Sequence, residues 1–101
     1  MNDKLDLSAV QEDFLARRWE SAESGCLRIL EQAPAHSPAQ ELLAKIQTAR
    51  GDFARAIETT ERAIGLSPNA ADLYRRCGDL YFNMRDLKKA IQLYTKKMIV
   101  I

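Results

Sequence analysis

The chain has 101 residues, 29% of them charged, and a formal net charge of +1 at pH 7. This length predicts one domain with a modest continuous core, and so small a net charge argues against nucleic acid or an acidic membrane as the default partner. The first residues lack a basic region followed by an apolar run, and no apolar stretch approaches the length of a membrane span. We therefore expect a cytoplasmic protein of bacterial type, without membrane insertion.

Six helices follow from the predicted caps and turns. Ser8 with Gln11 indicates a capping box at the first helix, and Ser37 with Gln40 indicates another at the third. Asn69 is expected to cap the fifth helix. The paired helices are expected to turn at Arg17-Arg18, at Arg50-Gly51-Asp52 and at Met84-Arg85-Asp86. The predicted helices cover residues 8–16, 19–32, 38–50, 53–66, 70–83 and 87–98.

A period of 34 residues runs through these helices. Pro34 and Pro68 are one period apart, and so are Ala22, Ala56 and Ala90. A fixed period of this length is typical of a helix-turn-helix solenoid, in which each unit buries its apolar face only against its neighbours. The recurrence predicts an all-α array of three helical hairpins.

Small residues mark the places where the two helices of a hairpin cross. Gly78 and Ala44 occupy equivalent positions on first helices, where a larger side chain would push the backbones apart. Trp19, Phe53 and Tyr81 are expected to fill the volume beside the small residues, because a packed core alternates large and small side chains. The recurring alanines are therefore interpreted as packing positions rather than as the result of helix propensity alone.

The repeat resembles the tetratricopeptide repeat, whose 34-residue pattern is Trp-x2-Leu-Gly-x2-Tyr, then Ala-x3-Phe, then Ala, then Pro. The third unit carries the pattern best, the second departs from it where the family prefers aromatic residues, and the first is the most degenerate. The matching residues are Tyr74, Cys77, Gly78, Tyr81, Ala90 and Tyr94 in the third unit, Leu43, Ala44, Phe53, Ala56, Ala63 and Pro68 in the second, and Trp19, Ala22 and Pro34 in the first. The departures in the second unit are Gln40, Gln47 and Thr60.

The resemblance covers residues 3–101 and implies a right-handed solenoid of three tetratricopeptide-like hairpins. We expect a single domain over residues 1–101, with units at about 3–36, 37–70 and 71–101. The family is not enzymatic in itself, so the resemblance implies a module that binds a protein or peptide partner.

In this family the first helices of the hairpins line a concave groove, which is the usual peptide-binding surface. The groove positions of this chain form a mixed surface with apolar anchors at Phe14 and Phe82. Arg76 is expected to hold a carboxylate or a backbone carbonyl of the partner. The predicted groove residues are Gln11, Phe14, Glu41, Lys45, Arg75, Arg76, Asp79, Phe82 and Asn83, with Leu7, Leu42 and Thr48 on the same projection.

The chaperone-binding members of the family use a two-carboxylate clamp of Lys, Asn, Asn, Lys and Arg. The corresponding residues of this chain are Leu7, Gln11, Leu42, Asp72 and Arg76, so only the arginine is retained. Capture of a heat-shock chaperone tail is therefore disfavoured.

Cys26 and Cys77 fall at apolar positions of the repeat and are interpreted as small buried hydrophobic residues. Neither has the close spacing or the histidine companion of a metal or redox site. The one histidine, His36, lies in a connection and is expected to be exposed. No nucleophile–base–acid set and no phosphate-binding loop is present, so we expect no catalytic residues, no metal and no cofactor.

The last four residues, from Met98 to Ile101, are apolar, whereas solenoids of this kind end on a polar outer face. Ile91 and Tyr94 are expected to pack back on the fifth helix. Two explanations stay open: the chain is a segment of a longer protein, or its exposed end forms a homodimer through the last helix. The functional alternatives are the N-terminal or regulatory segment of a larger glycosyl- or sulfotransferase-like enzyme, and a small secretion or assembly chaperone.

Overall fold

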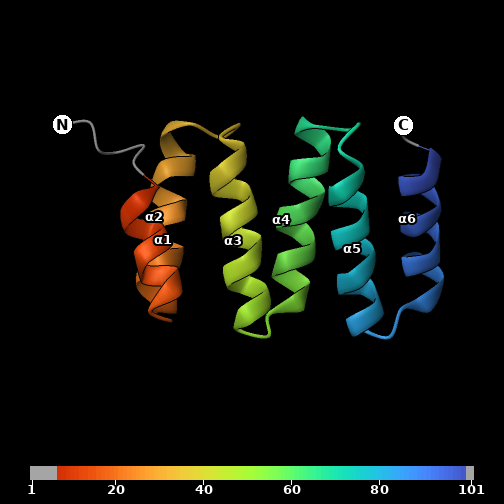
Figure 1. Ribbon diagram of the computed structural model, residues 1–101, viewed down its shortest axis with the longest axis horizontal. Helices are drawn as coiled ribbons and strands as arrows, with labels where there is room; N and C mark the ends of the chain where they lie inside the picture. The colour runs from red at the N-terminus through yellow and green to blue at the C-terminus, as the bar shows by residue number, and fades with distance from the viewer. Residues whose placement is uncertain (1–6, 100–101) are drawn as a thin grey trace.

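The computed structural model describes residues 7–99, with side chains described as far as residue 96. Six helices stand side by side in chain order (Figure 1). Their bounds are α1 Ser8–Leu15, α2 Trp19–Gln32, α3 Ser37–Ala49, α4 Phe53–Leu66, α5 Ala71–Asn83 and α6 Leu87–Ile99. Every predicted helix is confirmed, and each boundary lies within one residue of its expected place.

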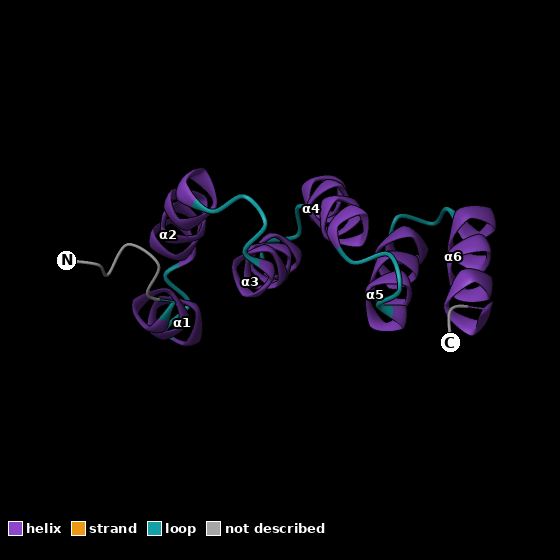
Figure 2. Cartoon of the chain, turned by 90° about the horizontal axis from the view of Figure 1, so that it is seen from above, coloured by secondary structure: helices purple, strands orange, loops and turns teal. Residues whose placement is uncertain are grey.

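The helices form an antiparallel array in which each one packs on its neighbours in sequence. Viewed from above, α1, α3 and α5 form one row, and α2 and α4 both lie on the same side of this row (Figure 2). The Cα atoms extend over 44 × 26 × 18 Å, and their radius of gyration is 13.9 Å. A compact domain of this length would have a radius of gyration of about 13 Å, so the array is slightly elongated. The predicted all-α repeat architecture is confirmed.

The three alanines of the 34-residue period occupy the core. Ala22 and Ala56 are 0% exposed, and Ala90 is 1% exposed. Gly78 of α5 faces the ring of Tyr94 on α6, because a Cβ atom added to it would lie 2.6 Å from Cε1 of Tyr94. Real Cβ atoms are excluded at that distance, so the small residue at this crossing is a packing requirement, as predicted.

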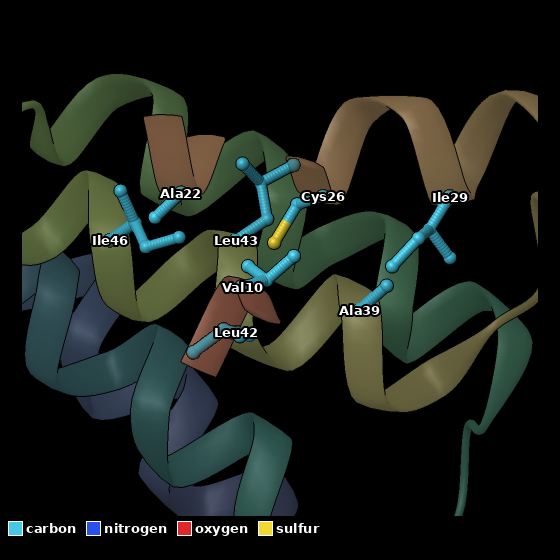
Figure 3. Packing of buried hydrophobic residues seen from close by; sticks show 8 residues of the cluster. All are labelled: Val10, Ala22, Cys26, Ile29, Ala39, Leu42, Leu43 and Ile46. Carbon is cyan, nitrogen blue, oxygen red and sulfur yellow. The ribbon is translucent and has the colours of Figure 1, made fainter. Parts of the chain in front are cut away.

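In the first hairpin a small residue also faces a larger one, but here the small residue is on the second helix and the larger one is on the first. Val10 on α1 is the counterpart of Gly78, and the small residue is now Gly25 on α2. A Cβ atom added to Gly25 would lie 2.6 Å from Cγ2 of Val10. Val10 joins residues of α2 and α3 in one apolar cluster (Figure 3). Trp19 is partly buried and packs against this cluster.

The turns inside the three hairpins share one backbone motif. Arg17, Gly51 and Arg85 are one period apart, and their φ angles are 62°, 80° and 68°. In the second hairpin the N–H of Gly51 donates to the carbonyl of Thr48 at 2.9 Å, and the next N–H reaches back to Gln47, also at 2.9 Å. The other two turns make the equivalent hydrogen bonds. This is the Schellman ending of a helix, whose left-handed residue is usually glycine.

The residue after each left-handed position begins the next helix. Asp52 and Asp86 cap α4 and α6, because their Oδ1 atoms accept the backbone N–H groups of Arg55 at 3.3 Å and Lys89 at 3.2 Å. Arg18 holds the same position before α2 and provides no side-chain cap. The first hairpin therefore has the least favourable turn of the three.

The predicted caps of α1, α3 and α5 are wrong by one residue. The N-cap positions belong to Leu7, His36 and Ala70 rather than to Ser8, Ser37 and Asn69. His36 is half-buried instead of exposed, because its Nδ1 accepts the N–H of Ala39 at 3.1 Å. An imidazole nitrogen thus takes the role expected of the serine hydroxyl.

Gln40 does not complete a capping box. Its side chain is buried, and its Nε2 donates to the carbonyl of Pro34 at 3.3 Å. One period later the hydroxyl of Tyr74 donates to the carbonyl of Pro68 at 2.8 Å. A glutamine in the second unit therefore makes the hydrogen bond that an aromatic residue makes in the third, which explains why the departure from the family pattern is tolerated.

Replacing Arg17 with Gly should raise the free energy of unfolding by about 0.5–1 kcal/mol, because glycine adopts a left-handed φ without the clash of a Cβ atom. Replacing Gly51 with Ala, the matched opposite change, should lower it by about 1 kcal/mol. Chemical denaturation followed by circular dichroism measures both. A less stable Arg17→Gly protein would contradict this account of the turn.

Candidate peptide-binding groove

A cavity of about 440 Å³ opens among the first helices, with α1, α3 and α5 contributing its walls and α4 part of its floor. Its lining is predominantly apolar, with charged side chains from α3 and α5. The lining residues are Phe14, Ala44, Lys45, Thr48, Ala49, Thr60, Arg75, Arg76, Asp79, Leu80 and Asn83.

The cavity lies where the second hairpin pairs two small residues. In the third hairpin the large Tyr94 covers the small Gly78. Their counterparts in the second hairpin are Thr60 and Ala44, and both line the cavity. The hydroxyl of Thr60 donates a hydrogen bond to the carbonyl of Ala56 at 2.8 Å. No large side chain fills this crossing, and the cavity lies over it.

Two carboxylates on α5 neutralise Arg75. Its Nη1 lies 3.1 Å from Oδ2 of Asp79, and its Nη2 lies 3.2 Å from Oδ1 of Asp72. The other oxygen of Asp79 accepts the hydroxyl of Tyr94 at 2.6 Å. This hydrogen bond, together with burial, raises the pKa of Tyr94 above its usual value, so the phenol stays a donor. Asp79 is thereby held in place by two partners.

Arg76 and Lys45 are the cations that remain open to a ligand. The nearest described carboxylate to Arg76 is that of Asp72, with its Oδ2 at 3.9 Å from Nη2. Lys45 is exposed and forms no ion pair with any residue that the structure describes. The groove therefore presents two cations beside an apolar floor, a combination that suits a carboxylate next to an apolar side chain.

Phe14 closes the N-terminal end of the groove. It is half-buried, and its ring meets that of Trp19 edge to face, with the centroids 5.6 Å apart and an interplanar angle of 64°. Such a pair holds an aromatic surface in one orientation at the cavity wall.

The cavity brings together six of the nine groove residues that the sequence predicts. They are Phe14, Lys45, Arg75, Arg76, Asp79 and Asn83. Gln11 and Glu41 are exposed and lie outside the cavity lining. Phe82 is 57% exposed and lines a separate shallow pocket with Asn83, Arg85 and Leu87, so it is not the apolar anchor of this cavity.

The sequence projection missed Ala49, Leu80 and the small pair beneath the cavity. Thr60 lies on a second helix, which a projection of first helices alone does not consider. The departure of Thr60 from the aromatic preference of the repeat was the signal that could have located the cavity.

Two of the positions that correspond to the two-carboxylate clamp are occupied by leucines that pack in the core. Leu42 is only 8% exposed and belongs to the apolar core, and Leu7 packs against the same cluster. Neither side chain offers a hydrogen-bond donor, so two of the five clamp positions lack one.

Cys26 and Cys77 are free, buried thiols, as predicted. Burial is the main cause that raises the pKa of Cys26 to about 12 and that of Cys77 to about 11, with Glu23 and Glu61 adding to the respective shifts. Thiols of this kind are inert at neutral pH. Within residues 7–96, where side chains are described, no group of three potential metal ligands occurs. None of the helices within residues 7–99 is long and apolar enough to cross a membrane.

The outer face of α6 is apolar and uncovered. Leu87 is 53% exposed and Ile91 is 63% exposed. Tyr94 packs back on α5 as predicted, whereas the same prediction for Ile91 is wrong, because this side chain is mostly exposed. The predicted apolar end lies outside the described part of the chain. It consists of the side chains of Met98 and Ile99 and of residues 100 and 101.

The fold and the groove define a helical-repeat protein of the class that binds other proteins. Residues 14–71 match one sequence profile described as Tetratricopeptide repeat, and residues 47–96 match a second with the same description. The chain belongs to the tetratricopeptide repeat family. A search of curated proteins gave no match.

Three solved structures illustrate the shared fold. A crystal structure of MamA has a TM-score of 0.86 and 19% identity over 95% of this chain and 58% of that chain. MamA 41-end from Desulfovibrio magneticus RS-1 has a TM-score of 0.83 and 21% identity over 90% of this chain and 51% of that chain. The first TPR of Spaghetti (RPAP3), bound to the HSP90 peptide SRMEEVD, has a TM-score of 0.85 and 18% identity over 97% of this chain and 79% of that chain.

These identities establish the fold alone. The chain spans little more than half of the length of the MamA structures that it matches.

Proposed function

We propose that this chain is a protein-interaction module that binds a segment of a partner protein in the groove formed by α1, α3 and α5. The observation that carries the proposal is the cavity over Ala44 and Thr60, with Arg76 and Lys45 at its edge and no carboxylate holding either cation closely. The expected ligand is a peptide that places an apolar side chain in the cavity and a carboxylate beside these cations.

Two further observations support this proposal. The charged lining side chains are three cations and one carboxylate, so the groove is positive although the chain as a whole is nearly neutral. The similar domain of RPAP3 is bound to a peptide that contains two glutamates and an aspartate.

Peptides selected from a displayed library against the immobilised domain test the proposal. Replacing Lys45 and Arg76 together with Ala should weaken the selected peptides about tenfold or more, because two charge-assisted contacts are lost. Isothermal titration calorimetry measures the affinity, and circular dichroism should show unchanged helicity. The matched control is Glu58→Ala, which removes an exposed charge from α4, outside the groove lining. Equal losses in the control and the groove variant would reject the groove as the site.

Two alternatives predict different outcomes in the same selection. A secretion or assembly chaperone would select apolar peptides without carboxylates, and the replacement of Lys45 and Arg76 would leave their binding unchanged. A regulatory segment of a glycosyl- or sulfotransferase-like enzyme would bind a catalytic domain rather than a short peptide. The cytoplasmic location of this chain stays a prediction.

We also propose that the outer face of α6 supports a weak homodimer. The counterparts of Leu87 and Ile91 one period earlier are Phe53 and Ile57, and these pack with α5. On α6 the same apolar stripe is uncovered, and contiguous apolar surface tends to find another chain.

Replacing Leu87 and Ile91 with Lys should convert any dimer into monomer without loss of helicity, because the variant removes the apolar area that would be buried. Sedimentation velocity over a range of concentrations measures the association. An unmodified protein that stays monomeric at high concentration would contradict self-association.

A further inference from the structure

A second groove lies on the opposite side of the array from the concave groove. It has a volume of about 230 Å³ and lies between α4 and α6, with Tyr74 of α5 contributing to its lining. Its apolar surface comes from Ile64 and Leu93, and its polar groups come chiefly from α6. The lining residues are Glu61, Ile64, Tyr74, Lys89, Gln92, Leu93 and Lys96.

Two tyrosine rings hold the two lysines of this groove. The Nζ of Lys89 lies 5.9 Å from the ring centroid of Tyr81, and the Nζ of Lys96 lies 5.9 Å from that of Tyr74. Cation–π contacts at this distance restrain an ammonium group without using its N–H donors. The two lysines are two helical turns apart on α6, which corresponds to about 10 Å along the helix axis.

Lys89 lacks the carboxylate that its counterpart has. One period earlier, Arg55 lies 3.9 Å from Oε2 of Glu23 and 3.7 Å from Oδ2 of Asp52. The counterpart of Glu23 between the second and third units is Ile57, so the ion pair between units is replaced by an apolar residue. Within the described residues, neither Lys89 nor Lys96 has a carboxylate oxygen within 4.0 Å.

The one carboxylate of the groove already has a partner. Oε2 of Glu61 accepts the hydroxyl of Tyr81 at 2.9 Å. Burial and this hydrogen bond raise the pKa of Tyr81 to about 12, so the phenol keeps its proton and continues to donate. The groove has a net positive charge, because α6 contributes Lys89 and Lys96 to its lining and Glu61 is the one carboxylate there.

We propose that the groove between α4 and α6 is a second docking site that takes an acidic segment of a partner protein. The segment places one carboxylate at Lys89 and another at Lys96, and its aliphatic side chain lies over Ile64 and Leu93. Gln92, between the two lysines, donates to or accepts from the backbone of the segment. The charge of the groove and the spacing of its lysines select this occupant, and the site is separate from the groove of the proposed function.

A peptide of the sequence Ser-Gly-Glu-Leu-Leu-Glu-Gly-Ser is a suitable probe, because in a polyproline II conformation, with three residues per turn, its two glutamates point to the same side and lie about 9 Å apart. The same peptide with glutamine in place of both glutamates is its control. Titration of the isotope-labelled protein, followed by amide chemical shifts, should show changes centred on Lys89, Gln92 and Leu93 with the glutamate peptide alone.

Charge reversal in the protein separates this site from a general positive field. The double variant Lys89→Glu/Lys96→Glu should bind the glutamate peptide about tenfold more weakly. Lys88→Glu makes the same kind of change on an exposed residue of α6 outside the groove, and it should bind within about twofold of the parent. If charge reversal disturbs folding, the milder Lys89→Gln/Lys96→Gln variant replaces it in the same binding measurement.

Four results would overturn the proposal. The first is an equal loss of peptide affinity in Lys88→Glu and in the double variant, and the second is chemical-shift changes confined to α1, α3 and the cavity face of α5. The third is the absence of saturable binding of the glutamate peptide. The fourth is binding of phosphatidylserine vesicles that depends on Lys89 and Lys96 while the peptide fails to bind. A negative result here would not affect the proposed function, because that proposal is tested with other variants, Lys45→Ala and Arg76→Ala.

Discussion

The close approach of helices over small residues is the constraint on which the rest of this structure depends. Ala22, Ala56 and Ala90 are essentially inaccessible, so each second helix contacts its neighbours through a single methyl group at this point. A larger side chain there would separate the hairpins and change the angle between successive units. The concave groove exists only because three first helices are held side by side in this spacing.

Variation around that constraint creates the two grooves. Where the third hairpin pairs Gly78 with Tyr94, the second pairs Ala44 with Thr60, and the unfilled volume becomes the cavity of the concave face. Where the first two units share an ion pair through Glu23, the next two have Ile57, and this leaves Lys89 without a carboxylate. Loss of the repeat consensus at particular positions thus provides the binding surfaces, while the retained positions provide the scaffold.

The fold was predictable from the sequence because one register governs all three units, so the helix bounds, the buried alanines and the glycine crossing were confirmed together. The caps were less predictable, since a histidine nitrogen can replace a serine oxygen and the choice depends on loop geometry. Six groove residues were located from the projection of first helices. Thr60 and the whole groove between α4 and α6 were missed, because they arise from contacts between helices, which the residue pattern of a single helix does not encode. The exposure of Ile91 was missed for the same reason, and Phe82 lies outside the cavity lining.

The most direct test of this account is the stability of Ala56→Leu. The account predicts that this variant loses about 1–3 kcal/mol of unfolding free energy through overpacking between α4 and its neighbours. Ala54→Leu, an exposed change on the same helix, should stay within about 0.5 kcal/mol of the parent. Urea denaturation monitored by circular dichroism measures both. An Ala56→Leu protein that unfolds at the same urea concentration as the parent would contradict the central role of the small-residue register.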